Sequence, residues 1–583
     1  MHKTTSPITQ ARRFALASLV VMAFILVGCG ANNANGARLA ADQTFIWPLT
    51  HASSFDDLIV DPPNTPDVYS AGVVDLVFGH LVTTDQNLNV IPDMATWDIS
   101  TDGLQYTFHI RPDLHFSDGT PLTAQDFAYS IDRALDPQVC VPIAGPGCHP
   151  RSTALFDIAG ATDRVAGRIA SDIGVGLFVS DAQTLLIKLA HPAAHFLETM
   201  TSNAVVPLER TLLEKYGVDH KNHTDWTYHL DEGGDSGPFI LNSYGDGKTL
   251  TFTANPYWHG PKLTLKRIIR PIVLDLTDAY TGYKQGQYDY ADVPPQDYLS
   301  ARDQSDYHEI GLLSVQFLGI NQLAPPFNNV QVRQAFALAL NKQLIADRVL
   351  NGSSVPTNHI VPQGQPGFYG ELTAPGSSTR TVTGDSAQAQ ELIKGYFTQC
   401  GCQSLTVTLT YPNDSKRTPV AQAMIQMWQT LLSGTWGQVT VVPQAVSFQT
   451  LAVTDFNATL NHAGPLQMWL IGLSTASPDP FNWLNGVFSP TGSLNVFNYR
   501  DDGTKYTAWS LVQQADAELD LDKRLALYNQ AEQQLVNAAL EVPYAQDKAL
   551  WRLRSYIQGF NPTALQVVPI PELAWANVSV LAH

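Results

Sequence analysis

Alternation of apolar and polar residues predicts a strand near residue 108. Tyr106, Phe108 and Ile110 occupy one face of this segment, whereas Thr107 and His109 occupy the other. A two-residue period is the pattern of a strand with one face in the core. The sequence therefore places a half-buried strand here, and residues 117–121 (Ser-Asp-Gly-Thr-Pro) supply the turn that follows it.

A helix is predicted directly after this turn. Thr123 and Asp126 resemble a capping box, with aspartate in place of the usual glutamate. Behind them the apolar residues recur at four-residue intervals, at Phe127, Ile131 and Leu135. This spacing predicts a helix over about 124–135.

Helical spacing of apolar residues predicts two more helices later in the chain. One carries the apolar residues Val332, Phe336, Leu340 and Leu344. The other carries Leu521, Leu525, Tyr528 and Leu535, and we expect Pro543 to stop it. Runs rich in β-formers, such as 405–409 and 438–442, lie between them. The chain is therefore of the mixed α/β class, and no internal repeat is visible.

The length of the chain indicates how many lobes it forms, and its net charge indicates which partners it does not bind. The chain has 583 residues, whereas single cores stop growing near about 250–300 residues, so two or three lobes are expected. With 44% hydrophobic and 10% aromatic residues, the body is globular throughout. The formal net charge of −19 repels phosphate backbones and anionic lipids, which argues against nucleic-acid binding.

The first residues have the layout of a secretory signal. A basic start is followed by an apolar run over 14–27, shorter than the roughly twenty residues of a membrane-spanning helix. The run ends in Leu-Val-Gly-Cys29, which resembles a bacterial lipobox. We expect a signal peptide over 1–28, lipidation at Cys29 and a flexible tether over 29–40; an uncleaved anchor helix or an ordinary signal peptide is the alternative. Cleavage would remove three positive charges and no acidic residue, so the mature chain would carry −22.

The remaining four cysteines form two local pairs. Cys140 and Cys148 flank a loop rich in Pro and Gly, and a disulfide there is geometrically easy. Cys400 and Cys402 could also be joined, although Cys-Gly-Cys closes a strained small ring. A zinc site made of all four cysteines is the alternative, but the spacing is not the usual one.

Several ordered motifs resemble one protein family. Residues 81–85 (Leu-Val-Thr-Thr-Asp), 102–111 (Asp-Gly-Leu-Gln-Tyr-Thr-Phe-His-Ile-Arg) and 116–123 (Phe-Ser-Asp-Gly-Thr-Pro-Leu-Thr) are similar to the opening of the extracellular solute-binding proteins of oligopeptide and dipeptide ABC importers. Residues 237–239, 254–258, 326–336 and Asp479-Pro480 continue the likeness in the family's order.

This resemblance implies a two-lobed clamshell of the periplasmic-binding-protein type, with two crossover segments as its hinge. Lobe I would consist of a main subdomain (41–78, 206–313 and 545–583) and an inserted subdomain (79–205), and lobe II of residues 314–544. Ligand would bridge the lobes and favour the closed form, which docks on the membrane permease. The expected protein is a lipid-anchored, extracytoplasmic monomer that binds a peptide or another small polar ligand, without a cofactor and without enzymatic activity.

The resemblance also suggests ligand-binding residues. One extended segment would contribute Trp469, Gly472, Leu473 and Ser474, with Gly472 allowing a ligand backbone to approach; an ordinary buried strand is the alternative. Val68 and Tyr69 would face it from lobe I. Ala476 stands where peptide binders of the family commonly carry an aspartate for the ligand's α-amino group. Asp479 could substitute, or the ligand could be an oligosaccharide, an opine or a nickel chelate.

Two motifs suggest other chemistry. The segment 234–238 (Gly-Asp-Ser-Gly-Pro) is close to the nucleophile loop of chymotrypsin-like proteases, so a secreted serine hydrolase using Ser236 is the remote alternative. His191 and His195 are four residues apart, but Pro192 lies between them and no glutamate follows His191, so we expect surface or loop histidines rather than a metal site. No phosphate-binding loop of the G-x-x-x-x-G-K-[ST] type occurs.

Overall fold

The structure is a computed structural model that describes residues 38–50, 52, 54–55, 58–65, 68–139, 155–217, 225–243, 247–370, 372–460, 464–475, 478–490, 495–501, 503, 507–565 and 570–583. Leu39–His583 form one compact unit. The signal peptide, Cys29 and most of the tether lie outside the described residues, as do Cys140 and Cys148. Among the described helices, none has the length and apolar character needed to cross a membrane.

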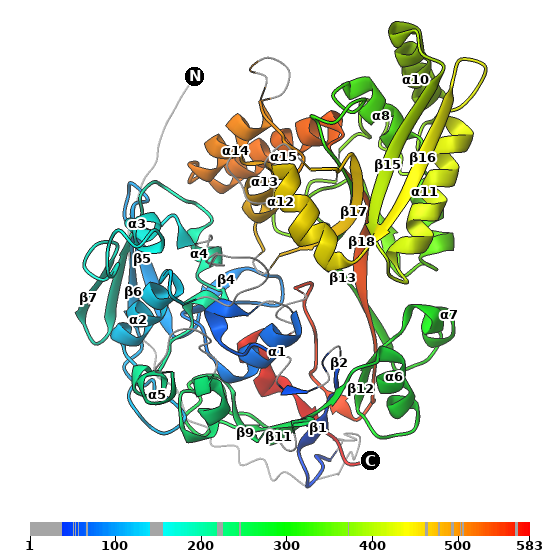
Figure 1. The fold of residues 1–583 in the computed structure, drawn as a ribbon. Coiled ribbons are helices and arrows are strands. Elements are labelled where there is room, and N and C mark those ends of the chain that lie inside the picture. The colour runs from blue at the N-terminus through cyan, green and yellow to red at the C-terminus, as the bar shows by residue number, and fades with distance from the viewer. Residues whose placement is uncertain are drawn as a thin grey trace, which may run out of the picture. The chain divides into compact units, whose positions relative to one another are not determined.

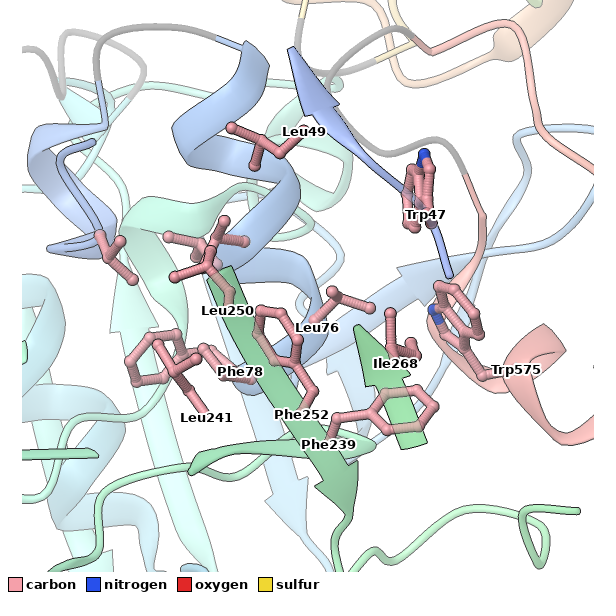
Figure 2. Packing of buried hydrophobic residues seen from close by; sticks show 14 of the residues in the cluster. Trp47, Leu49, Leu76, Phe78, Phe239, Leu241, Leu250, Phe252, Ile268 and Trp575 are labelled. Atoms are coloured by element: carbon pink, nitrogen blue, oxygen red, sulfur yellow. The ribbon is translucent and has the colours of Figure 1, made fainter. Parts of the chain in front are cut away.

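A mixed five-stranded sheet lies beneath the first buried core. Its order is β1 (Thr44–Ile46), β11 (Arg267–Val273), β10 (Thr249–Ala254) and β9 (Phe239–Ser243), and β2 (Leu49–Thr50) also pairs with β11. The pairs with β1 and β2 are parallel, whereas β9, β10 and β11 run antiparallel. Figure 2 shows Phe239, Leu241 and Phe252 of this sheet packed against Leu76, Phe78 and Trp575. This cluster therefore joins segments from the beginning, middle and end of the chain.

A second core belongs to residues 81–205. The hairpin β3 (Val82–Thr84) and β4 (Val90–Pro92) precedes an antiparallel sheet in the order β5 (Ala95–Ile99), β6 (Gln105–Ile110), β8 (Thr184–Lys188) and β7 (Leu177–Asp181). The strand predicted around residue 108 is confirmed as β6, in which Tyr106, Phe108 and Ile110 are buried. The predicted capping box is also confirmed, because Thr123 and Asp126 cap α2 (Ala124–Ala134) reciprocally.

Long strands dominate the third sheet. Its order is β12 (Tyr290–Asp292), β18 (Glu541–Leu553), β13 (Tyr307–Ile320), β17 (Met468–Ser474), β15 (Ser404–Pro412) and β16 (Gln438–Val446), with β14 (Ser354–Pro356) paired to β18. Figure 1 shows β13 and β18 running side by side between α6 and β17. The lobe boundaries expected at 313/314 and 544/545 fall inside these two strands. The strands predicted at 405–409 and 438–442 are confirmed as β15 and β16.

Helices cover these sheets. The remaining α-helices are α1 (Val68–Val77), α3 (Ala161–Val165), α4 (Phe196–Thr199), α5 (Arg210–Tyr216), α6 (Leu276–Lys284), α7 (Tyr298–Ala301), α8 (Val330–Leu338), α9 (Lys342–Leu344), α10 (Ser386–Cys400), α11 (Arg417–Leu431), α12 (Phe456–Leu460), α13 (Pro480–Phe488), α14 (Ala508–Asp516) and α15 (Leu521–Ala538). Shorter 3₁₀ or π turns are Pro62–Asn64, Asn203–Val205, Asp225–Glu232, Pro295–Asp297, Ile345–Val349, Thr450–Asp455 and Glu572–Asn577. A last strand pair is β19 (Ile557–Gln558) and β20 (Ser579–Val580). The predicted mixed α/β class is confirmed.

Two helix predictions need correction. The apolar repeat from Val332 to Leu344 is divided between α8 and α9, because the side chain of Asn341 caps a new helix by accepting a hydrogen bond from the Leu344 N–H. Pro543 does not stop α15. That helix ends at Ala538, since Ala539 adopts the left-handed conformation with φ 50°, and Pro543 lies in β18.

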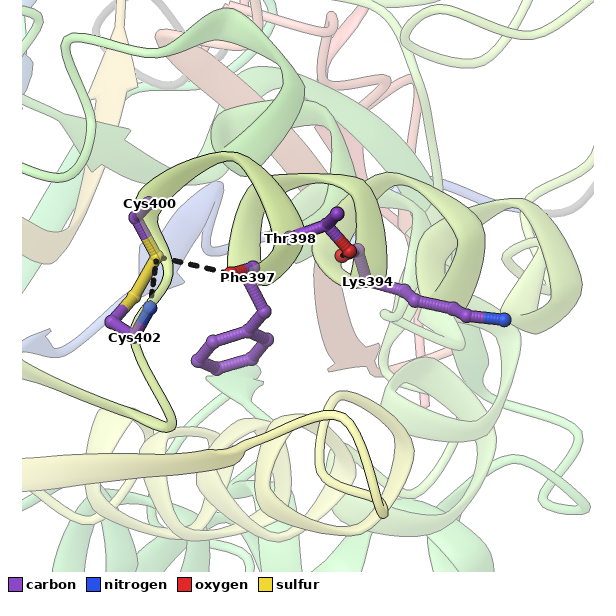
Figure 3. The surroundings of a disulfide bond; sticks show 5 residues. All are labelled: Lys394, Phe397, Thr398, Cys400 and Cys402. Carbon is purple, nitrogen blue, oxygen red and sulfur yellow. Dashed lines mark hydrogen bonds between the residues drawn. A yellow bond between two sulfur atoms is a disulfide. The ribbon is translucent and has the colours of Figure 1, made fainter.

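A disulfide bond joins Cys400 and Cys402 at the end of α10 (Figure 3). Gly401 between them has φ +63°, a conformation that glycine adopts without steric cost. The backbone N–H of Cys402 donates to Cys400 Sγ at 3.2 Å. With these two sulfurs bonded to each other, the four-cysteine zinc site considered above has lost two of its ligands.

Candidate functional site

A cavity of about 670 Å³ opens beside the two long strands. Its walls come from segments expected in lobe I, including the start of α1, β11 and β12, and from segments expected in lobe II, including residues 349–354 and 415–419. Strand β18 supplies Asp547, Lys548, Ala549, Leu550 and Trp551 to the same cavity. The cavity is of the size that holds small ligands, since such sites span about 300–1,000 Å³.

Aromatic side chains form much of the wall. Trp47 meets Tyr290 and Phe560 edge to face, with ring centroids 5.8 Å and 5.4 Å apart, and Tyr69 and Trp551 also line the cavity. Such packing fixes the ring planes and presents apolar surface to a ligand. The site is therefore suited to an organic molecule with apolar parts.

Arg270 is the buried cation of this cavity. It lies on β11 on the same face as buried Ile268, and only 6% of its surface is exposed. Its guanidinium stacks on Trp47 at 4.0 Å from the ring centroid. Nε donates to Trp47 O at 3.4 Å and Nη1 to Gly72 O at 3.5 Å, both long hydrogen bonds. Burial lowers the pKa of Arg270 to about 10, although Asp292 acts in the opposite direction.

Asp547, which also lines the cavity, is the centre of a hydrogen-bonded group. Lys416 Nζ donates to its Oδ1 at 2.7 Å, while Ser314 Oγ and Gln316 Nε2 donate to its Oδ2 at 2.9 Å and 2.8 Å. These contacts tie β13, β18 and the segment before α11 together. Within the site, the Lys416 ammonium therefore compensates the charge of Asp547.

Of the two predicted ligand-binding segments, one lines the cavity and the described residues of the other do not. Val68 and Tyr69 line the cavity. On β17, Trp469 is 1% exposed and packs on Phe456 and Phe497, away from the cavity lining. The space above Gly472 is occupied by Gln316, whose Nε2 would lie 2.2 Å from a Cβ there.

Gly472 therefore does not line the cavity. Gln316, which covers Gly472, donates to Asp547 of the cavity wall. Leu473 packs on a buried cluster, and Ser474 at the end of β17 is exposed. Ala476 lies outside the described residues. The roles of Trp469, Gly472, Leu473 and Ser474 as ligand contacts stay predictions.

Asp479 is part of a buried ionic group. Its carboxylate caps α13 by accepting from the Phe481 N–H at 2.8 Å and pairs with Arg524 of α15. Glu198 of α4 lies close to both. Burial, followed by repulsion from Asp479, raises the pKa of Glu198 to about 7. Residues expected in the inserted subdomain and in lobe II thus share one electrostatic environment.

His195 lies in the turn before α4, in agreement with the surface or loop position expected from sequence. It is nevertheless only 2% exposed, and its ring stacks on Phe481 with centroids 3.4 Å apart. Its Nε2 contacts Asp157 Oδ2 at 2.9 Å. Burial alone would lower the pKa of His195, but the hydrogen bond and charge of Asp157 raise it above its usual value. His191 is exposed, as expected, and contacts the same carboxylate at 3.3 Å.

Ser236 lacks the surroundings of a nucleophile. It is 2% exposed, and its Oγ accepts a hydrogen bond from the Gly79 N–H at 3.0 Å. Among the described residues, no histidine forms a hydrogen bond with Ser236. A substrate could not reach this hydroxyl without local unfolding, and the imidazole base that a serine hydrolase needs is missing from the contacts of the described chain.

A second titratable cluster lies outside the cavity. Ligand atoms of Asp93, His259 and Glu572 lie within 4.8 Å of one another, close enough for one metal ion. His259 Nε2 contacts Asp93 Oδ1 at 2.7 Å, and His80 Nδ1 contacts Glu572 Oε2 at 3.0 Å. Burial, then the nearby charge of Asp93, raises the pKa of Glu572 well above its usual range. The raised pKa favours a protonated Glu572, which limits the negative charge of this buried cluster.

Sequence reasoning missed the residues that give the cavity its charge and its aromatic wall. Arg270 stands in the apolar run 268–273, at a position whose two-residue period assigns it to the buried face. A charge at a buried position is the signal that could have found it. Trp47 and Trp551 carry no comparable signal, because aromatic residues are common in any core.

Comparisons with known proteins agree with this geometry. Residues 89–495 match the family model described as "Bacterial extracellular solute-binding proteins, family 5 Middle". The chain belongs to this family. The matched part covers β4 to α13 and includes most of the long sheet. The resemblance expected from the sequence motifs is thereby confirmed.

Individual family 5 proteins are similar over nearly their whole length. The probable deoxycholate-binding periplasmic protein YgiS of Escherichia coli K12 is 28% identical over 540 residues, covering 89% of this chain and 93% of that protein. The periplasmic oligopeptide-binding protein OppA of the same organism is 26% identical over 551 residues, covering 92% and 93%.

Solved structures show the fold. The unliganded open form of the periplasmic murein tripeptide binding protein MppA has a TM-score of 0.73 at 22% identity, covering 94% of this chain and 99% of the other. Haemophilus influenzae OppA in complex with the peptide RPPGFSPFR has a TM-score of 0.70 at 20% identity, covering 94% and 100%. This family 5 protein therefore has the two-lobed α/β fold of periplasmic binding proteins.

Proposed function

We propose that this protein is an extracytoplasmic substrate-binding lipoprotein that captures peptides by closure of its two lobes and delivers them to the permease of an ABC importer. Family membership over residues 89–495 is the observation that carries the proposal. The cavity lined by segments of both expected lobes supports it, because only a closed form can contact a ligand on both sides. The proposal includes no catalytic step.

Mass spectrometry of small molecules released by denaturing the signal-free protein tests the proposed ligand. A set of short peptides released from the purified protein is the expected result. A single non-peptide compound, with no stabilisation of the protein by any peptide added afterwards, would contradict the peptide role. Peptides that bind should raise the melting temperature in a concentration-dependent way.

The lipid anchor has its own test. The Cys29→Ser variant should appear in the soluble extracytoplasmic fraction, whereas the wild-type chain should fractionate with membranes, because a single cysteine carries the proposed acyl groups. Mass spectrometry of the mature N-terminus gives an independent measurement. A C29S chain that stays with the membrane would argue for the uncleaved anchor helix instead.

A second candidate is the same fold with a non-peptide ligand. Two observations favour it: Ala476 replaces the expected amino-group partner, and the relative at 28% identity is named for deoxycholate. Thermal shift with deoxycholate beside the peptides separates the two candidates. We do not propose the serine hydrolase, since Ser236 is buried and hydrogen-bonded to the backbone of Gly79.

A further inference from the structure

The cations that line the cavity differ in their partners. Three cations, Arg270, Lys416 and Lys548, and two carboxylates, Asp292 and Asp547, belong to the described lining. Lys416 pairs with Asp547 at 2.7 Å, and Lys548 pairs with Glu309 at 3.1 Å. Among the described residues, no carboxylate oxygen lies within 4.0 Å of Arg270. Of the three cations in the described lining, Arg270 is therefore the one without a carboxylate in contact, and the charge of Asp292 acts on it from a greater distance.

Arg270 is also held in place before any ligand arrives. Trp47 supports one face of the guanidinium, and the backbone carbonyl of Gly72 accepts from Nη1. A buried charge without a counter-ion is costly. The two long hydrogen bonds to the carbonyls of Trp47 and Gly72 offset only part of that cost, since each is at the distance limit.

The geometry points to Arg270 as the residue that binds an acidic group of the ligand. This inference rests on the proposed function only in taking the cavity as the ligand site. A planar guanidinium can donate two parallel hydrogen bonds to a carboxylate, which a lysine cannot do. The neighbouring rings of Trp47, Tyr69 and Phe560 would contact the apolar part of the same molecule.

The ligand class is therefore a carboxylic acid with an apolar portion. The carboxylate has three possible sources: the C-terminus of a peptide, an acidic side chain, or a non-peptide organic acid. All three would present the same chemistry to Arg270. They differ in the chemical change that removes the charge: C-terminal amidation, replacement of Glu and Asp by Gln and Asn, or esterification of the organic acid. The experiment uses this difference.

Binding is measured by thermal shift and titration calorimetry on the full signal-free chain with matched acid and neutral probes. Peptide pools of two to six residues are made with free C-termini, with C-terminal amides, and with Glu and Asp replaced by Gln and Asn. Deoxycholate and its uncharged methyl ester form the non-peptide pair. The wild type should prefer at least one acid over its neutral partner by about 10-fold or more, because hydrogen bonds to a charged group are the strong ones.

The Arg270→Gln variant should reduce that preference to near one. Arg267→Gln is the matched control, since Arg267 lies on the same strand but is exposed and contacts Thr44 and Asp42; it should keep the wild-type preference. If R270Q does not fold, Arg270→Lys decides the question, because a point charge should keep only part of the preference. An acid preference that is absent in the wild type, or unchanged in the Arg270 variants, overturns the inference.

The same experiment separates this inference from the proposed function. If only deoxycholate binds, and its preference over the ester depends on Arg270, the peptide role fails and the role of Arg270 stands. If peptides bind but amides and Gln/Asn pools bind as well as acids, the peptide role stands and the role of Arg270 fails.

Discussion

At the residue scale, the buried charges of this protein divide into compensated and uncompensated groups. Asp547 receives three hydrogen bonds, one of them from a lysine, so both of its oxygens have partners. Glu198 differs, because its Oε2 is buried without a hydrogen-bond partner and the charge of Asp479 repels it. Its pKa of about 7 makes it one of the buried carboxyls whose ionisation opposes folding at neutral pH.

Glu198→Gln should therefore raise stability at high pH. The folded pKa lies above the unfolded value of 4.5, so the favourable contribution of wild-type Glu198 is complete below about pH 4.5 and is lost as the pH rises through about 7. We expect E198Q to exceed the wild type by roughly 2–3 kcal/mol at pH 8 and to match it near pH 4.5. Urea unfolding across this range gives the measurement.

The control for this titration is Glu391→Gln, which changes an exposed glutamate on α10. It should leave the pH profile of the wild type intact. An E198Q profile parallel to that of the wild type at every pH would refute the assignment of the titration to Glu198.

At the element scale, β17 shows how a glycine can make room for a neighbouring side chain inside the protein. The position opposite Gly472 in the ladder is Gln316, whose amide fills the space above it and donates to Asp547. Likewise, Gly319 makes room for the indole of Trp469, which would lie 2.2 Å from a Cβ. The two glycines let β13 and β17 carry large side chains, Gln316 on one face of the sheet and Trp469 on the other.

Gly472→Ala should displace Gln316 from Asp547 and lower the free energy of unfolding by about 1–2 kcal/mol, the cost of a lost hydrogen bond to a charge with local repacking. The same substitution in a Gln316→Ala background should cost much less, because the amide that it strikes is gone. Gly395→Ala on α10 is the control. Nothing lies within 4 Å of its Cβ position, so alanine there should stabilise the helix. Equal costs of G472A in both backgrounds would exclude the steric explanation.

The elements that the sequence predicted correctly are those determined by neighbouring residues. Strand β6 follows from its alternation, and α2 follows from the capping box at Thr123. The end of α15 was missed because a left-handed Ala539, not a proline, sets it. The cavity was only half anticipated: Val68 and Tyr69 were named through the family likeness, whereas Arg270, Lys416 and Asp547 are brought together by pairing over hundreds of residues, which no local pattern records.

At the scale of the whole molecule, the inserted subdomain and lobe II of the expected division meet at His195 and Phe481. Their stacked rings lie next to the Asp479–Arg524 pair, and the Ala194 N–H donates to Asp516 O at 3.1 Å. Leu88 at the tip of the β3–β4 hairpin is also buried in the cluster that contains Trp469 and Trp483. Under the proposed function, these contacts stabilise the closed form.

Phe481→Ala should favour the open form. Loss of the stacked ring removes contact area that exists only when the two parts meet, so the radius of gyration from small-angle X-ray scattering should increase without ligand and the ligand affinity should fall by about 10-fold. Phe448→Ala is the matched control, since Phe448 is 55% exposed. An F481A protein with wild-type scattering and affinity would show that this contact does not bias closure.

The ladder between β13 and β18 is interrupted at the cavity. Gly311 pairs with Lys548 and Val315 with Gln546, so Leu312, Leu313 and Ser314 together face Asp547 alone. Such an extra loop of backbone is where a long strand bends. If the lobes rotate about this point, atoms nearest the axis travel least. Leu312 and Asp547 would then contact a ligand almost equally in the open and closed forms, and would set the affinity of the open form. Side chains far from the axis would contact the ligand only after closure, and would determine how strongly each ligand favours the closed form.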